Sequence, residues 1–435
     1  MTSRTRYPAR CEEEAAAYIH GVCLKNGPPS KVGVELEWLI RDPRDPAAHV
    51  PASRIGAAVR VFTGHERLPS SSTPGVLPSG SLLTAEPGGQ LEVSSLPADS
   101  LAGCVHATMA DLAVLRAAIA DAGLELAGVG LDPVRAPRRI LDLPRYAAME
   151  EFFDRGGPWG RRMMCGTASV QASLDAGDES DGVAGYRYRW RLLHAIGPVI
   201  VAAFANSPLR EGRPTGWKSS RQQVWAHLDR GRTRPVHSGP IGSPRSLNRG
   251  GDPRDAWVAY ALDAEVMLIR GRASRDWSAP PGLTLRQWLR GAGAVLREPD
   301  TDDVAYHLST LFPPVRPRGH FEVRVADAQP GNGWIVPLAV TAALAGDARA
   351  ADTALAAASR IHGGLAGDPW LRAARVGPAD AAIAQASRDC FEAARAALQR
   401  ASAPAAVIAA VDAFIDAYVG RDRCPADDLI EETCR

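Results

Sequence analysis

Alternation of polar and apolar residues is the most informative pattern in the chain. In the segment 32–40 the even positions are all apolar, and Glu35 and Glu37 lie between them. Side chains alternate between the two faces of a strand, so the two glutamates project together, about 7 Å apart. The ordinary interpretation of one such segment is a half-buried antiparallel strand whose outer face meets solvent.

Three further segments repeat this pattern and form the predicted strands 90–94, 167–175 and 320–325. A Gly-Gly turn precedes the first of them, and Glu86 lies just before that turn, from where it could fold back onto the same face. The strand 167–175 carries short hydroxyls and amides without Lys or Glu, which is unusual for a solvated face. The polar positions are Gln90, Glu92 and Ser94; Thr167, Ser169, Gln171, Ser173 and Asp175; and His320, Glu322 and Arg324.

Four such strands in one chain, three of them supplying glutamates, favour a sheet whose concave polar face binds hard cations. Magnesium takes oxygen ligands and keeps waters and phosphate oxygens in its shell, so carboxylates spread over several strands suit it. The alternatives are solvent-facing strands and, for Glu322 and Arg324, a weak surface ion pair within one strand.

Helical periodicity marks the remaining elements and predicts an α+β protein. Helices are expected at 101–122, 186–204 and 255–269. The last hundred residues are alanine-rich and almost free of strand formers, with helices at 350–361, 379–400 and 405–418. We therefore predict a catalytic core at 1–335 and a helical C-terminal region at 336–435 that packs on it.

Composition and charge narrow the range of partners. The 50 Lys and Arg residues balance 49 Asp and Glu residues, which gives no electrostatic reason to expect nucleic acid or an anionic membrane as a partner. Seven cysteines without a CxxC pair disfavour a disulfide scaffold and a structural zinc site. Without a signal-peptide pattern or an uninterrupted apolar stretch of about 20 residues, a cytoplasmic location is expected.

No standard nucleotide-binding or nucleophile motif is present. The segment 212–219 differs from a P-loop because Trp217 separates glycine from lysine, and neither GxGxxG before a helix nor GxSxG occurs. If the protein uses ATP, metal ions and arginines must hold the phosphates. Arg221, Gln223 and Trp225 would share one side if their segment is extended, although an arginine on an ordinary solvated surface is the alternative.

Taken in order, these segments resemble the glutamate–cysteine ligase family of plant and proteobacterial type, and more closely its actinobacterial branch serving ergothioneine synthesis. This chain differs from the plant-type pattern at three places. After the tryptophan the plant type has Thr-Asp-Thr-Asp, whereas this chain has the residues from Ala226 to Asp229. The plant type also has histidine at the position of Gln223 and glycine at the position of Val325. The matching segments are 33–37, 86–92, 167–171, 204–208, 221–225, 307–308, 312–313 and 321–324.

The resemblance implies a glutamine-synthetase-like core and ATP-dependent ligation of L-glutamate to L-cysteine through a γ-glutamyl phosphate. There are two alternatives: a ligase of the same fold that uses another amine acceptor, and a non-catalytic protein that binds an amino acid or a nucleotide. The implied roles are Glu35, Glu37, Glu86, Glu92 and Glu322 as Mg²⁺ ligands; Arg324 on the transferring phosphoryl group; Arg221 on the glutamate α-carboxylate or a phosphate; and Gln90, Thr167, Ser169, Gln171, Gln223 and Trp225 in substrate or nucleotide binding.

Overall fold

One antiparallel sheet contains all four of the alternating segments. The computed structural model describes residues 11–236, 251–271, 275–292, 297–364 and 367–433. Within these residues eight strands form the sheet, in the order β2-β3-β4-β1-β6-β10-β9, with β5 paired to β1. The strands are β1 (Val32–Arg41), β2 (Gly75–Val76), β3 (Leu82–Ala85), β4 (Leu91–Ser94), β5 (Glu125–Ala127), β6 (Ser169–Asp175), β9 (Val315–Pro317) and β10 (His320–Asp327); β7 (Leu209–Arg210) and β8 (Arg213–Pro214) form a separate hairpin.

The register of the central strands places the predicted polar residues on the same face. Glu37 of β1 lies opposite Glu92 of β4. Glu35 lies opposite Gln171 of β6, and Ser173 of β6 lies opposite Glu322 of β10. All of these pairings are antiparallel, as predicted.

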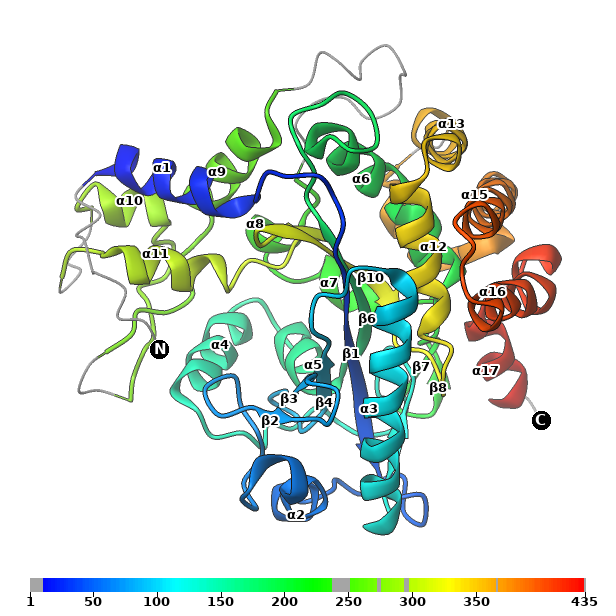
Figure 1. The fold of residues 1–435 in the computed structure, drawn as a ribbon. Helices are drawn as coiled ribbons and strands as arrows, with labels where there is room; N and C mark the ends of the chain where they lie inside the picture. The colour runs from blue at the N-terminus through cyan, green and yellow to red at the C-terminus, as the bar shows by residue number, and fades with distance from the viewer. Residues whose placement is uncertain (1–10, 237–250, 272–274, 293–296, 365–366, 434–435) are drawn as a thin grey trace.

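The other face of the sheet is apolar and packs on helices α3 (Leu101–Asp121), α6 (Tyr186–Ala203) and α12 (Ile335–Gly346) (Figure 1). Val34, Leu36 and Trp38 of β1 are buried in this interface. Burial of side chains of this size contributes about 1.5–3 kcal/mol each. Among the described residues only α3 is long and apolar enough to cross a membrane by length and composition, and here it packs against β1 and β5 as a helix of the core.

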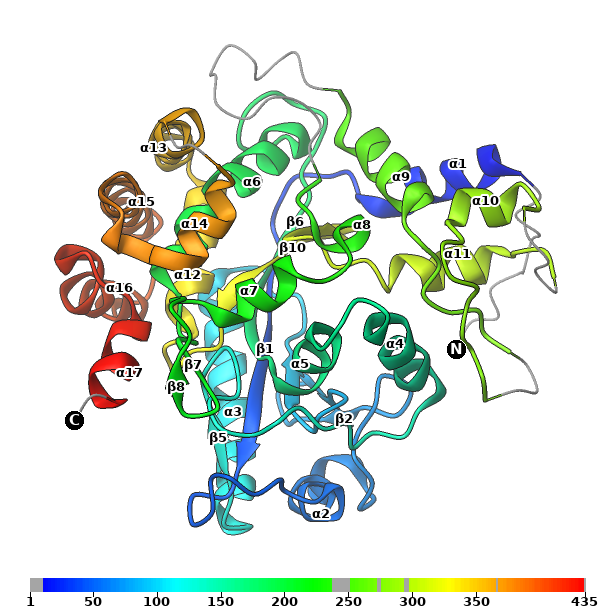
Figure 2. The same cartoon turned by 180° about the vertical axis from the view of Figure 1, so that it is seen from behind.

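Shorter helices lie on the polar side of the sheet, as the view from behind shows for α4, α5 and α7 (Figure 2). Ser219 lies directly before helix α7 and caps it, because its hydroxyl accepts a hydrogen bond from the Gln222 amide. The remaining helices before the C-terminal region are α1 (Glu12–Cys23), α2 (Ala52–Thr63), α4 (Pro144–Asp154), α5 (Trp159–Gly166), α7 (Ser220–Ala226), α8 (Arg230–Thr233), α9 (Pro253–Asp263), α10 (Leu285–Leu289) and α11 (Thr301–Leu308).

The C-terminal region is helical, and it shares one hydrophobic core with the sheet domain. Buried alanines such as Ala354 and Ala386 allow helices to approach closely, and α15 packs against α6, α12 and α13. The helices are α13 (Ala348–Gly364), α14 (Pro369–Val376), α15 (Ala381–Arg400), α16 (Ala405–Ala417) and α17 (Pro425–Thr433).

The structure departs from the local pattern at two places: one predicted helix is shorter, and one segment considered as extended is a helix. The helix expected at 255–269 ends at Asp263, because Glu265 and Leu268 instead form bridges with Thr284 and Ser278. The segment around Arg221 is a helix and not extended, so its residues do not alternate between two sides. In both cases contacts distant in the sequence override the local pattern.

Candidate active site

Carboxylates on neighbouring strands form the first part of the candidate site. Glu37 accepts hydrogen bonds from the Ser169 hydroxyl at 3.0 Å and from the Gln171 amide at 2.9 Å. Glu92 accepts one from the Thr84 hydroxyl of β3, also at 3.0 Å. The strand register and these donors fix the two carboxylates in position.

A tight turn brings Glu86 to the same group. The Gly89 amide donates to the Glu86 carbonyl at 2.8 Å, and the Glu86 amide donates to the Gln90 carbonyl at 2.8 Å. Gly89 has φ +87°, and a side-chain carbon on Gly88 would lie 2.3 Å from the Cys165 carbonyl oxygen, so both turn positions require glycine. The predicted return of Glu86 toward the polar face is therefore built into the Gly-Gly sequence.

Burial and mutual repulsion raise the pKa of three of these carboxyl groups. Burial and then the neighbouring Glu92 and Glu37 raise the pKa of Glu86 to about 8. Burial and then Glu37 raise the pKa of Glu92 to about 7. For Glu35, burial is again the first cause and Glu322 the second, and its pKa lies well above the usual value. The nearby protein cations therefore do not fully stabilise the ionised forms of these three carboxyl groups.

Glu322 has a different environment, because three arginines surround it. Arg316 of β9 binds it in a bidentate pair, with Nε to Oε2 at 2.5 Å and Nη2 to Oε1 at 2.8 Å. Arg318 Nη1 donates to Oε1 at 3.2 Å and Arg324 Nη1 to Oε2 at 3.1 Å. Burial favours the neutral acid, but these three cations hold the pKa of Glu322 well below its usual value. Its predicted role as a magnesium ligand would require an arginine to release one of the oxygens.

Arg324 joins the arginine group to the carboxylate group. Its Nη1 also donates to Gln171 Oε1, and the Gln171 amide in turn donates to Glu37. The predicted residues Ser169, Gln171, Glu322 and Arg324 thus belong to one hydrogen-bonded network across β1, β6 and β10. A chemical group above this network would meet carboxylates on one side and guanidinium groups on the other.

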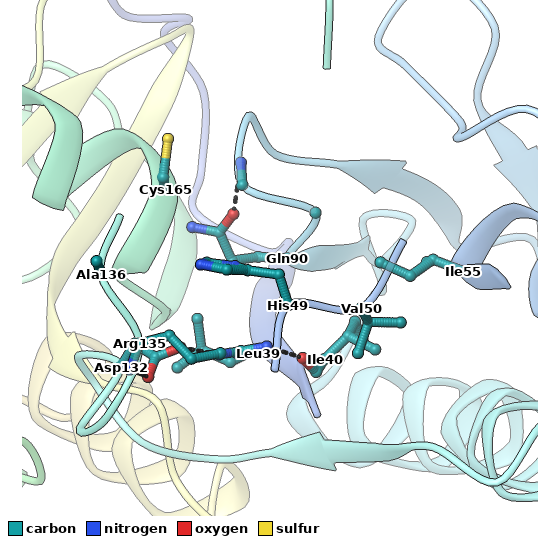
Figure 3. A pocket seen from close by; sticks show the side chains of 12 residues that line it. Leu39, Ile40, His49, Val50, Ile55, Gln90, Asp132, Arg135, Ala136 and Cys165 are labelled. Carbon is teal, nitrogen blue, oxygen red and sulfur yellow. Dashed lines mark hydrogen bonds and ion pairs between the residues drawn. The ribbon is translucent and has the colours of Figure 1, made fainter. Parts of the chain in front are cut away.

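Gln90 and Thr167 were predicted to contact substrate, but the structure uses their polar atoms internally. The Gln90 amide nitrogen donates to the Met164 and Thr167 carbonyls, and its oxygen accepts from the Gly88 amide (Figure 3). The Thr167 hydroxyl donates to the Met163 carbonyl at 2.6 Å. Gln90 thus holds the turn after Glu86 against the end of α5, and the Thr167 hydroxyl bonds back to that helix.

Behind this turn lies a small cavity, lined in part by His49, Arg135 and Cys165 (Figure 3). Its volume is about 20 Å³, room for about one water molecule, so it cannot hold an amino-acid substrate. Burial raises the pKa of the Cys165 thiol to about 12, which makes it a poor nucleophile.

Helix α7 places Arg221 and Trp225 beside Arg324. The guanidinium groups of both arginines lie over the Trp225 ring, at 6.0 Å and 5.9 Å from its centre. Arg221 is buried and its Nη2 donates to the Arg324 carbonyl at 2.8 Å, while its Nε and Nη1 have no hydrogen-bond partner among the described residues. Gln223 is half-buried on the same helix, and no described hydrogen bond joins its side chain to the network.

The donor set suits magnesium better than a softer metal. Four carboxylates, Glu35, Glu37, Glu86 and Glu92, present only oxygen atoms, and magnesium uses one or two carboxylates together with water and substrate phosphates. Among the described residues no three His, Cys, Asp or Glu side chains converge as a ready-made metal cage. Oxygen donors whose ionised forms lack a compensating protein cation therefore fit a cation that arrives with a phosphate ligand.

Sequence reasoning missed Arg316 and Arg318. Both lie in the segment Val-Arg-Pro-Arg, directly before the strand of Glu322. The two arginines are two positions apart, as Glu322 and Arg324 are, and this spacing could have indicated that they share one face of a strand. Its meaning depends on the pairing of β9 with β10, which puts Arg316 opposite Glu322.

Comparison with known proteins places this site in a family. The chain matches the sequence model of glutamate–cysteine ligase family 2 (GCS2) over residues 31–432. It is 37% identical over 420 residues to "Glutamate--cysteine ligase EgtA" of Mycobacterium tuberculosis, covering 95% of this chain and 89% of that protein. A relative of the same name from Mycolicibacterium smegmatis is 37% identical over 426 residues, covering 96% and 90%.

The fold also has a solved counterpart. The crystal structure of a glutamate–cysteine ligase from Francisella tularensis in complex with AMP aligns with a TM-score of 0.50 at 12% identity, covering 94% of this chain and 85% of that one. This likeness confirms the predicted fold class, and the sequence matches confirm the predicted family. The chain belongs to glutamate–cysteine ligase family 2.

Proposed function

We propose that this protein uses ATP and Mg²⁺ to join the γ-carboxylate of L-glutamate to the amine of L-cysteine, giving γ-glutamylcysteine. The observation that supports this most strongly is the network in which Glu322, three arginines, Gln171 and Glu37 are connected across the sheet. Family membership supplies the substrates of the proposal. The AMP complex of the Francisella tularensis relative is consistent with a nucleotide as co-substrate.

The chemistry needs charge stabilisation and no protein nucleophile. A γ-carboxylate oxygen attacks the terminal phosphorus of ATP and releases ADP, and the cysteine amine then attacks the carbonyl carbon of the acyl phosphate, losing a proton as phosphate departs. Glu35, Glu37, Glu86 and Glu92 would hold Mg²⁺. When bound, Mg²⁺ supplies a positive charge that offsets the negative charge of the phosphate oxygens.

The arginines of this chain have distinct parts in the proposal. Arg324 presents a planar fork beside the carboxylates and contacts the transferring phosphoryl group. Arg316 and Arg318 hold Glu322 and so fix the position of Arg324 from the other side. Arg221 Nε and Nη1 make no hydrogen bond among the described residues, although Nη1 lies 3.8 Å from Asp327 Oδ1. These two donors would bind a carboxylate or phosphate that enters beside Trp225.

A release assay with a set of amines tests this function. The purified protein with ATP, Mg²⁺ and L-glutamate should release ADP rapidly only when L-cysteine is added, and γ-glutamylcysteine should appear in equal amount. A faster reaction with another amine would assign a different ligase activity, and no ADP with any amine would indicate a binding protein.

The biological part of the proposal is supply of γ-glutamylcysteine for ergothioneine synthesis in the cytoplasm. It rests on the resemblance to the actinobacterial branch of the family. A deletion strain should lose ergothioneine and regain it with the wild-type gene but not with a Glu92→Gln variant.

A further inference from the structure

Strand β10 contains a β-bulge at Arg324. Val323 lies opposite Ala172 of β6, but the next paired residue, Ala326, lies opposite Val170. Two residues, Arg324 and Val325, therefore stand opposite the single residue Gln171. Bulges of this kind leave the extra residue without a regular ladder partner and redirect side chains near functional sites.

The bulge decides which side chains reach the polar face. Because the extra residue shifts the register, Asp327 lies opposite Ser169. In a regular strand Ala326 would take that place, since a slip of one residue exchanges the two faces. Arg324 and Asp327 can share the polar side only because the bulge separates them.

Helix α7 holds both backbone carbonyls of the bulge. Arg221 Nη2 donates to the Arg324 carbonyl at 2.8 Å. The neighbouring Gln222 donates through Nε2 to the Val325 carbonyl at 2.9 Å. Two consecutive side chains of one helix thus bind two consecutive carbonyls of the irregular strand, which a regular ladder would otherwise satisfy.

The same helix is tied to the strand beyond the bulge. Asp327 accepts hydrogen bonds from the Ser219 hydroxyl at 2.9 Å and the Ser207 hydroxyl at 2.7 Å. Ser219 caps α7, and Ser207 accepts a hydrogen bond from the Arg221 amide at 3.1 Å. The start of the helix is therefore fixed to Asp327, and its first turn reaches back to the bulge.

We propose that Gln222 is a positioning residue. Together with the Arg221 side chain, which binds the Arg324 carbonyl, Gln222 stabilises the bulge and so aims Arg324 at the reacting phosphoryl group. The inference rests on the proposed function for its catalytic part only. Gln222 is the informative position because its amide serves the Val325 carbonyl and no role in substrate binding is assigned to it.

Gln222→Met tests the inference, because methionine keeps the length of the side chain and removes the N–H donor. Small misplacements of a catalytic group cost up to about a hundredfold in rate, so we expect kcat to fall roughly tenfold. KM for glutamate and for cysteine should stay within about twofold, because no substrate contact is lost. Hydrogen exchange of the peptide 320–327, measured by mass spectrometry on the full-length protein, should become faster.

Tyr188→Phe is the matched control. It also removes one inter-element hydrogen bond, from the Tyr188 hydroxyl to Asp352 at 2.9 Å, but between α6 and α13. It should leave kcat and the exchange of 320–327 unchanged.

Two outcomes would overturn the inference: unchanged exchange of 320–327 in Gln222→Met, or faster exchange with unchanged kcat. If the wild-type protein does not make γ-glutamylcysteine, the proposed function fails. Unchanged exchange would still contradict the stabilisation of the bulge by Gln222.

Discussion

The carboxylates of the polar face differ mainly in how many arginines lie beside each of them. Glu322 lies among Arg316, Arg318 and Arg324, whereas Glu86 and Glu92 face mostly other carboxylates and have raised pKa values. The arginines and the carboxylates are therefore separated along the sheet. This separation suits a reaction in which a phosphoryl group passes between a bound cation and guanidinium groups.

Arg324→Lys should lower kcat by roughly tenfold to a thousandfold, the range for loss of one transition-state donor. Lysine keeps the charge but not the planar guanidinium group, whose Nη1 donates to both Gln171 and Glu322. The melting temperature should change little, because Arg316 still neutralises Glu322. Steady-state kinetics and a melting curve are the measurements. Unchanged kcat with a lower melting temperature would make Arg324 structural.

Glu35→Gln and Glu92→Gln should each lower the ligation rate at least about a hundredfold, since each removes a carboxylate proposed to hold magnesium. Neither variant should melt at a lower temperature, because an amide relieves repulsion between buried carboxylates. Glu66→Gln, on an exposed glutamate, is the control and should keep full activity. Near-normal turnover in either test variant would refute the ligand assignment.

At the scale of elements, packing determines how a familiar pattern is used. Helix α11 carries His307, which lies in one of the segments that resemble the family. Its side chain is buried against α9, where Nε2 donates to the Ala261 carbonyl at 2.9 Å. Burial and then Arg232 lower the pKa of His307 to about 3. The residue thus has a structural role as a neutral histidine that joins two helices.

This histidine predicts an acid sensitivity of the fold. Its pKa is about 3 in the folded protein, below the ordinary 6.5, so between these values the unfolded chain binds more protons. The stability from neutral His307 is complete above pH 6.5 and decreases as the pH falls toward 3, by at most about 1.4 kcal/mol per pH unit. The variant His307→Gln keeps a hydrogen-bond donor at this position but has no side-chain group that titrates in this pH range.

Denaturant unfolding at several pH values measures this effect. Below pH 6.5 the free energy of unfolding should fall less steeply for His307→Gln than for the wild type. Equal slopes for the two proteins would contradict the prediction.

At the scale of the whole molecule, one hydrophobic core extends from α1 through the sheet to α16. The predicted boundary at residue 335 falls at the first residue of α12, a helix that packs against β6 on one side and against α13, α15 and α16 on the other. The C-terminal helices should therefore unfold together with the sheet that carries the site.

Ala354→Leu on α13 tests this cooperativity. Ala354 is fully buried, so a larger side chain should destabilise the protein by about 1–3 kcal/mol. Helicity and ligation activity should be lost at the same, lower temperature. Ala356→Leu, on an exposed position of the same helix, should leave the midpoint nearly unchanged. Loss of helicity below the temperature at which activity disappears would indicate an independent C-terminal unit.

The sequence by itself determined which residues share a face, because alternation along a strand is a local property. Glu35 and Glu37, Ser169 and Gln171, and Glu322 and Arg324 lie as their spacing predicts. It also determined the family, through the order of segments that were weak individually. The turn at Glu86 followed from two glycines whose backbone no other residue could adopt without strain or collision.

Only the tertiary structure decided which partners these residues have. The arginines around Glu322, the internal use of Gln90 and Thr167, and the bulge at Arg324 depend on the pairing of strands far apart in the sequence. A bulge inserts one residue into a strand and leaves the preceding alternation intact, so the pattern up to Val325 gave no sign of it. The helix around Arg221 has a similar origin: Ser219 caps it locally, but its contacts with Ser207 and with β10 join residues far apart in the sequence. Local periodicity specifies a face, and long-range packing specifies what that face meets.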